Sequence, residues 1–299
     1  MDAPHASVID VQEDCTSHEN GGCANIIAGE EGSKQAAKGM QETREFSPLQ
    51  KALAELIGTF FVVFVGCGGS IVLKEESAVG RVSMALSGGI VVMIMIFCTA
   101  HISAAHLNPA VTLAFAAAGL FPWIQVLPYI LSQMIGSLLA SLGLQLIVDD
   151  STLFSLIVNQ PLHHNRASFV MEVIATFALM LVNMKVACHL GSGGVVGVLV
   201  GPFMIGTTVA LVGLYAGPLS GGLSMNPARS IGPALVAVNF KSLHIFVIGP
   251  IIGAISSGIL YNTITSTNND NVSLRLYKHV VDSLKEKTYK SSPQKETCS

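Results

Sequence analysis

The sequence predicts an all-α membrane protein with six transmembrane helices and two shorter helices that enter the membrane and turn back. Three observations lead to this fold class: long apolar segments, two copies of an Asn-Pro-Ala tripeptide, and one internal repeat. Of the 299 residues, 51% are hydrophobic and only 12% are charged, whereas a soluble domain carries about 25% charged residues. The six Cys show no metal-ligand spacing, so we expect no metal and no cofactor. The net charge of −3 gives no reason to expect nucleic acid as a partner.

Six apolar segments are each long enough for a membrane-spanning helix, which needs about 20 residues. They run from about 53 to 73, 82 to 100, 123 to 148, 167 to 188, 196 to 216 and 243 to 264. Ten of the 16 Lys and Arg residues precede the first segment or follow the last, and this excess predicts that both ends of the chain are cytosolic. We therefore expect a multi-pass protein of the lipid bilayer, in the plasma membrane.

The membrane part is expected to cover residues 49–264, between two polar tails. Residues 1–48 are acidic and polar and are predicted to be a disordered cytosolic tail. Residues 265–299 form a basic, Ser- and Thr-rich tail on the same side. Within the membrane part, one repeat covers about 50–148 and the other about 166–264.

The repeat is visible in matched residues of the two halves. Glu172 follows Glu55 by 117 residues, and each lies in a similar apolar context that ends in Thr-Phe. Asn226 follows Asn108 by 118 residues, so the second half has one extra residue before its Asn. Each half has three spans, an odd number, and the halves are therefore inverted relative to each other. Such repeats are typical of membrane transport proteins.

The two Asn-Pro-Ala tripeptides are predicted to begin the two short helices. They consist of Asn108, Pro109 and Ala110, and of Asn226, Pro227 and Ala228. An Asn side chain accepts a hydrogen bond from a free N–H group at a helix start, and Pro suits the first position because its missing N–H costs nothing there. Lipid offers no partner to free backbone groups. The two helix starts must therefore cap each other or face a water-filled path.

Charged residues inside apolar stretches are candidates for function, because a charge in the membrane is costly. Arg229 follows the second tripeptide, and we expect it to line the path, repel cations and donate to solute oxygens. Glu55 and Glu172 could relay protons. Their symmetric placement favours a structural role instead, in which each accepts hydrogen bonds from backbone N–H groups of a re-entrant loop.

The motifs resemble those of the aquaporin, or major intrinsic protein, family over residues 50–265. They are Ser-Ala-Ala-His-Leu-Asn-Pro-Ala-Val-Thr at 103–112 and Ser-Met-Asn-Pro-Ala-Arg-Ser-Ile-Gly-Pro-Ala at 224–234. The flanks, among them Gly-Cys-Gly at 66–68, are similar to those of the plant nodulin-like intrinsic proteins (NIPs). The resemblance implies a homotetramer of channels, each with its own pore, in which Asn108 and Asn226 face the pore near the middle of the bilayer.

The resemblance also implies which residues form the narrowest ring of the pore. By position these are Gly88, Gly213, Arg229 and either Gly222 or Leu223, because the extra residue of the second half leaves the last position open. A ring of glycines with one Arg resembles the NIP subgroup that passes metalloid acids, above all silicic acid, and also boric acid, arsenous acid, urea and glycerol. If Leu223 fills the ring, the pore is narrower and more apolar.

The predicted function is a passive channel for small uncharged solutes, namely metalloid acids such as silicic and boric acid, glycerol, urea and water, that excludes protons and ions. One alternative is a channel mainly for water and glycerol. Another is an ion-coupled secondary transporter, which is also built from inverted repeats but needs a group that changes charge near the middle of the membrane. We expect no enzyme, because the sequence has no Ser-His-Asp order, HExxH motif or phosphate-binding loop.

Overall fold

The computed structural model describes residues 45–72, 77–148, 155–161, 164–189 and 194–265, so nearly all of both predicted tails lies outside the described residues. Within these ranges the chain forms eight α-helices, one short 3-10 helix and no strand. The elements are α2 (Pro48–Val72), α3 (Ala78–Ser103), α4 (Pro109–Ala117), α5 (Trp123–Val148), η1 (Ser155–Ile157), α7 (Asn165–His189), α8 (Gly194–Ser220), α9 (Pro227–Val236) and α10 (Leu243–Thr265).

Six of these helices, α2, α3, α5, α7, α8 and α10, are long and apolar enough to cross a membrane. The shortest of them, α10, has 23 residues. At about 1.5 Å per residue it extends about 35 Å, more than the hydrocarbon core of about 30 Å. The helices α4 and α9 have 9 and 10 residues and are too short to cross. The predicted fold class, six spans and two short helices, is confirmed.

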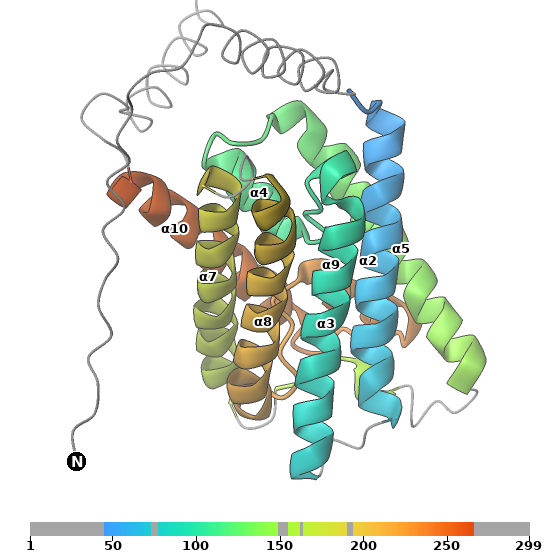
Figure 1. Ribbon diagram of the computed structural model, residues 1–299. Coiled ribbons are helices and arrows are strands. Elements are labelled where there is room, and N and C mark those ends of the chain that lie inside the picture. Colours follow the sequence, from blue (N-terminus) through green and yellow to red (C-terminus); the bar gives the residue numbers. More distant parts are fainter. Residues whose placement is uncertain (1–44, 73–76, 149–154, 162–163, 190–193, 266–299) are drawn as a thin grey trace, which may run out of the picture. The chain divides into compact units, whose positions relative to one another are not determined.

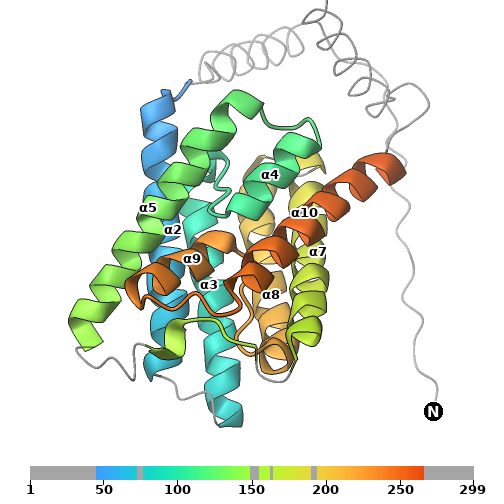
Figure 2. The same ribbon diagram turned by 180° about the vertical axis from the view of Figure 1, so that it is seen from behind.

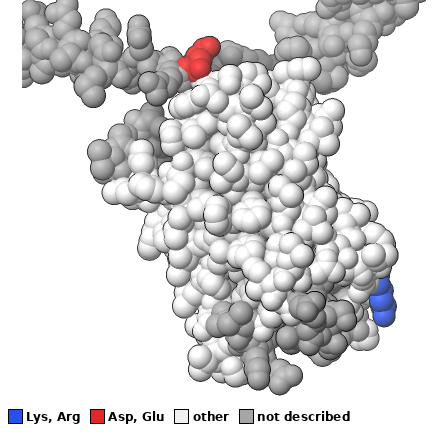
Figure 3. Space-filling model, turned by 90° about the vertical axis from the view of Figure 1, so that its right-hand side faces the viewer, with Lys and Arg blue, Asp and Glu red and all other residues white. Residues whose placement is uncertain are grey.

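The outer surface of the described part is apolar, as contact with lipid requires. On α2 the side chains of Leu53, Ile57, Phe61 and Val65 follow one another at a spacing of four residues and are all exposed. The opposite face of the same helix carries the buried residue Glu55. Figure 3 shows a broad face without charge, on which coloured side chains lie only near the two ends.

The two halves repeat one order of helices and pack into each other. In the first half α2 packs on α3 and α5, and in the second half α7 packs on α8 and α10. The halves meet where α3 lies beside α8 (Figure 1). Each short helix crosses to the other half, since α4 packs on α10 and α9 packs on α5; Figure 2 shows these four helices from behind.

Two glycines at equivalent positions allow long helices of each half to touch. A Cβ atom added to Gly136 would collide with the backbone carbonyl of Leu56 in α2, and one added to Gly253 would collide with that of Val173 in α7. Close backbone approach is a main source of helix association in lipid. These contacts bring α2 against α5 and α7 against α10.

Candidate functional site

The helices α4 and α9 both begin at an Asn-Pro-Ala tripeptide. Asn108 is the N-cap of α4, and its Oδ1 accepts from the N–H of Ala110 at 2.9 Å. Asn226 is the N-cap of α9, and its Oδ1 accepts from the N–H of Ala228 at 3.0 Å. Pro109 and Pro227 follow in the first helical position. The carbonyl oxygens of both Asn side chains are thus used to hold the helix starts.

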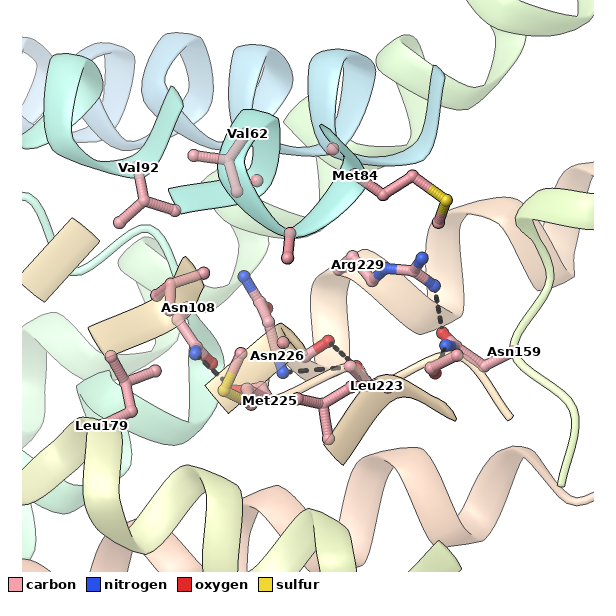
Figure 4. Close-up of a pocket in the computed structure, with 18 of the residues that line it drawn as sticks. Val62, Met84, Val92, Asn108, Asn159, Leu179, Leu223, Met225, Asn226 and Arg229 are labelled. Carbon is pink, nitrogen blue, oxygen red and sulfur yellow. Dashed lines mark hydrogen bonds between the residues drawn. The ribbon is translucent and has the colours of Figure 1, made fainter. Parts of the chain in front are cut away.

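The same two side chains also tie the two halves together. Asn108 Nδ2 donates to the backbone oxygen of Met225 at 2.7 Å, as Figure 4 shows. Asn226 Nδ2 donates to the backbone oxygen of Leu107 at 2.9 Å. An Asn amide has two N–H groups, and the second of each has no partner within the described ranges. Because both residues line the same cavity, these second N–H groups are available to a passing solute.

Glu55 holds the loop that leads into α4. Its Oε1 accepts from the N–H of His106 at 2.9 Å and from Ser103 Oγ at 2.7 Å. Its Oε2 accepts from the N–H of Leu107 at 2.7 Å and from Gln133 Nε2 at 2.8 Å. The carboxylate is fully buried and is not part of the cavity wall. Two of these contacts hold the backbone of the loop, and the other two tie the carboxylate to the end of α3 and to α5.

Glu172 does the same for the loop that leads into α9. Its Oε1 accepts from the N–H of Ser224 at 2.7 Å, and its Oε2 accepts from the N–H of Met225 at 2.9 Å. Met225 and its counterpart Leu107 have left-handed backbones, with φ angles of 54° and 51°. Such a backbone costs about 1–2 kcal/mol in residues other than Gly. The Glu contact at the N–H and the Asn contact at the carbonyl hold each of them in place.

The wall of a cavity of about 210 Å³ includes both the paired Asn side chains and Arg229. Figure 4 shows Asn108 near one end and Arg229 near the other. Every residue that the sequence analysis assigned to the narrowest ring contributes to its wall: Gly88, Gly213, Gly222, Leu223 and Arg229. The structure therefore brings the candidate residues together around one space.

The glycines of this wall fall into two kinds. A Cβ atom added to Gly88 meets no heavy atom within 4 Å, and one added to Gly213 meets only Ala85, at 3.6 Å or more. Their missing side chains leave open space in the cavity. Gly222 differs, because its φ angle of 98° suits only Gly and an added Cβ atom would lie 3.3 Å from Asn159 Nδ2. Here the backbone itself requires glycine.

Leu223 lies in the cavity wall and packs against an apolar cluster beside it. Its side chain is partly buried against the apolar cluster that includes Ile205, Ala216 and Met225. Both Gly222 and Leu223 are therefore near the path. Gly222 contributes only its backbone to the wall, whereas Leu223 contributes a side chain that is partly buried against the apolar cluster.

Arg229 is held by the connector between the two halves. Its Nη1 donates to the backbone oxygen of Ile157 at 3.3 Å and to Asn159 Oδ1. Asn159 Nδ2 in turn donates to the backbone oxygen of Gly222, and its Oδ1 also accepts from Ser230 Oγ at 2.8 Å. Asn159 is 5% exposed. One buried amide thus links the guanidinium to the loop before α9.

Asn159 is not among the residues that the sequence predicts to line the path. It lies in the polar connector between the halves and belongs to no motif. A local signal does exist, because three apolar residues, Leu156, Ile157 and Val158, directly precede it. Ile157 and Val158 are buried, and a short apolar run inside a polar connector can indicate that the connector folds into the protein.

The charges around the cavity favour neutral solutes. The N-termini of α4 and α9 carry the positive ends of their helix dipoles, and the guanidinium of Arg229 adds a full positive charge. The described wall residues include no Asp or Glu. No group of three or more His, Cys, Asp or Glu that could hold a metal ion occurs in the described ranges. The charged side chains of the described wall, Arg81 and Arg229, are both positive and oppose the passage of a cation.

Comparisons with known proteins identify relatives over most of the chain. Residues 42–261 match the family described as major intrinsic protein. Aquaporin NIP1-1 from Zea mays is 41% identical over 262 residues, which are 84% of this chain and 89% of the relative. A probable aquaporin of NIP type from Nicotiana alata is 43% identical over 221 residues, 74% of this chain and 79% of the relative.

Two further comparisons agree with these. Putative aquaporin NIP4-1 from Arabidopsis thaliana is 43% identical over 222 residues, 73% of this chain and 76% of the relative. Among solved structures, the aquaglyceroporin from Plasmodium falciparum matches with a TM-score of 0.66 and covers 76% of this chain and 100% of that one. Its sequence identity is 20%, so this likeness supports the fold alone.

Proposed function

The chain belongs to the major intrinsic protein family, and on this premise we propose that it is a passive channel for glycerol, urea and metalloid acids such as boric and silicic acid, as well as water. Membership of the family and the NIP-named relatives support a channel for small neutral solutes in a multi-pass membrane protein. The identity of the solutes is the part that we propose.

The observation that carries this proposal is the open space at Gly88 and Gly213. Added Cβ atoms at these positions would meet no heavy atom closer than 3.6 Å. The cavity is therefore wide near Arg229 because these two positions carry no side chain. Solutes wider than water need this width. The free N–H groups of Arg229, Asn108 and Asn226 then donate to the oxygens of a hydroxylated solute.

The contacts of the two buried carboxylates favour a channel over an ion-coupled transporter. A coupled carrier needs a residue that can change charge where the solute binds. Glu55 and Glu172 lie outside the described cavity wall and accept hydrogen bonds from the loops. The middle of the path holds two neutral amides, those of Asn108 and Asn226. We therefore propose that transport is passive and excludes protons and ions.

For the fourth position of the ring we propose Gly222 rather than Leu223. The backbone of Gly222 lies in the cavity wall and is tied to Asn159, which also holds Arg229. Leu223 has an apolar cluster to pack against. In this arrangement the extra residue of the second half is accommodated beside the ring and does not close it.

The assembly and location of the channel are further parts of the proposal. The resemblance implies a homotetramer in the plasma membrane with both ends of the chain in the cytosol. The exposed apolar side chains that cover the outer surface suit contact with lipid and with further copies of the chain. Chemical cross-linking in the membrane tests the tetramer, and a ladder that stops at the dimer would contradict it.

Uptake by liposomes that contain the purified protein tests the proposed solutes. We expect uptake of boric acid, silicic acid and glycerol above that of empty liposomes, together with osmotic water flow. Imposing a proton gradient should leave the uptake unchanged. Passage of water and glycerol without the metalloid acids would favour the narrower channel that we consider as the alternative. Uptake driven against a solute gradient by protons would overturn the passive mechanism.

A further inference from the structure

A polar side chain lies in a part of the cavity wall that is otherwise apolar. Asn183 belongs to the membrane-spanning helix α7 and lines the cavity together with Leu179, Val92, Ile96 and Ile205. Polar residues within spanning helices are costly, so they usually face a water-filled cavity and serve a function. Neither the repeat nor the Asn-Pro-Ala motifs account for Asn183.

Asn183 lies on the far side of the paired Asn side chains from Arg229. In the first half of α7, Glu172 accepts a hydrogen bond from the N–H group of Ser224, in the loop before α9. Leu179, about two turns later, lies beside Asn108 at the end of the cavity away from Arg229 (Figure 4). Asn183 follows one turn further on, about 6 Å along the helix axis. The order of these side chains along the path is therefore Arg229, the Asn pair and Asn183.

The side-chain amide of Asn183 is oriented by one hydrogen bond, and its oxygen has no partner among the described residues. Its Nδ2 donates to the backbone oxygen of Leu179 at 2.9 Å, which is its only hydrogen bond to the described residues. The bond holds the amide along the helix and leaves Oδ1 without a donor. An Asn side chain can accept two hydrogen bonds at this oxygen.

This free oxygen differs from the polar side chains at the other two positions. Arg229 can only donate. The Oδ1 atoms of Asn108 and Asn226 each already accept one hydrogen bond, from the N–H groups of Ala110 and Ala228, and these bonds hold the oxygens toward the helix starts. A solute with hydroxyl groups has donors of its own that need acceptors. Of these four side chains, only that of Asn183 presents an oxygen that accepts no hydrogen bond from the described residues.

We infer that Asn183 is a specificity-determining residue, at which hydroxylated solutes donate to Oδ1 after they have passed the Asn pair. A solute that fills the path loses its hydration water among apolar side chains, and each unpaired hydroxyl is then costly. Water moving in single file keeps hydrogen bonds to neighbouring waters and depends less on this contact. The inference rests on the proposed function, since it concerns the same pore and the same solutes.

The experiment compares wild-type protein with Asn183→Leu and Asn183→Gln in liposomes with equal amounts of incorporated protein. Leu has a similar size without polar atoms, whereas Gln keeps the amide. Asn262→Leu is the matched control, because Asn262 also donates to a backbone oxygen, that of Ala118 at 2.7 Å, but is not among the wall residues. For each variant we measure glycerol and boric acid uptake and osmotic water permeability.

We expect Asn183→Leu to lower the ratio of glycerol or boric acid uptake to water permeability about fivefold, the effect of one lost hydrogen bond. Asn183→Gln should restore most of the ratio, and Asn262→Leu should leave it unchanged. An unchanged ratio in Asn183→Leu, or an equal loss in Asn262→Leu, would overturn the inference while the channel stands. Wild-type protein that passes water but no solute would instead overturn the proposed function, and the inference with it.

Discussion

The guanidinium of Arg229 donates to the side-chain oxygen of Asn159, a residue 70 positions earlier in the chain (Figure 4). Asn159 also donates to the backbone oxygen of Gly222. A long Arg side chain has many rotamers, and holding it in one costs up to about 2 kcal/mol of entropy. The connector between the two halves thus helps to hold two members of the proposed ring in their relative positions.

Asn159→Ala should therefore change selectivity more than stability of the fold. It leaves a backbone oxygen and a guanidinium N–H without their partner, at a local cost of about 1–3 kcal/mol. We expect the ratio of boric acid uptake to water permeability to change several-fold. Asn159→Asp keeps an oxygen for Arg229, but it loses the donor to Gly222 and adds a negative charge beside the guanidinium, so we expect it to change the ratio as well. A wild-type ratio in Asn159→Ala would show that Arg229 does not depend on this contact.

Gly88→Trp should close the ring to wide solutes. The indole would occupy the open space beside Arg229, and we expect uptake of boric and silicic acid to fall at least about tenfold, the scale on which a fitted pocket rejects a larger group. Water should continue to pass. Gly143→Ala is the control, because its Cβ atom would meet only Phe64, at 3.6 Å and beyond, away from the cavity wall. Unchanged metalloid uptake in Gly88→Trp would remove Gly88 from the ring.

Gly222 and Leu223 are separated by a pair of substitutions. Gly222→Ala introduces a side chain at a φ angle of 98° and close to Asn159, and the strain of about 1–2 kcal/mol should reduce solute uptake. Leu223→Gly should leave the range of permeant solutes unchanged if Gly222 is the ring member. Liposome uptake of glycerol, urea and boric acid distinguishes the two. Entry of larger polyols through Leu223→Gly would identify Leu223 as the residue that sets the width.

Glu172→Gln should lower stability without uncoupling any flux. The Gln oxygen can accept from only one of the two N–H groups of Ser224 and Met225, so the other faces an amide N–H, at a cost of about 1–3 kcal/mol. We expect a lower melting temperature in detergent, measured by calorimetry, and normal passive uptake per folded molecule. Glu55→Gln should behave alike. Loss of a proton-driven flux in a variant that remains folded would favour the coupled transporter.

The six spans and the two short helices could be predicted from the sequence alone. Hydropathy and length identify a span from about 20 consecutive residues, and Asn followed by Pro identifies a helix start from two. The repeat, with Glu55 matched by Glu172, also pointed to a symmetric role for the two carboxylates. All of these signals are short-range or repeated, so no knowledge of the packing was needed.

The way in which the halves meet around the path could not be predicted from the sequence and is seen only in the folded chain. Asn159 has no motif, and it reaches Arg229 because the connector folds back over a loop 70 residues away. The position of Asn183 on the far side of the Asn pair follows only from the packing of α7 against the rest of the fold. Whether Gly222 or Leu223 lies in the ring depends on a single residue of register in a loop with left-handed backbone angles. Such contacts depend on the packing of distant segments, which hydropathy and capping rules do not specify.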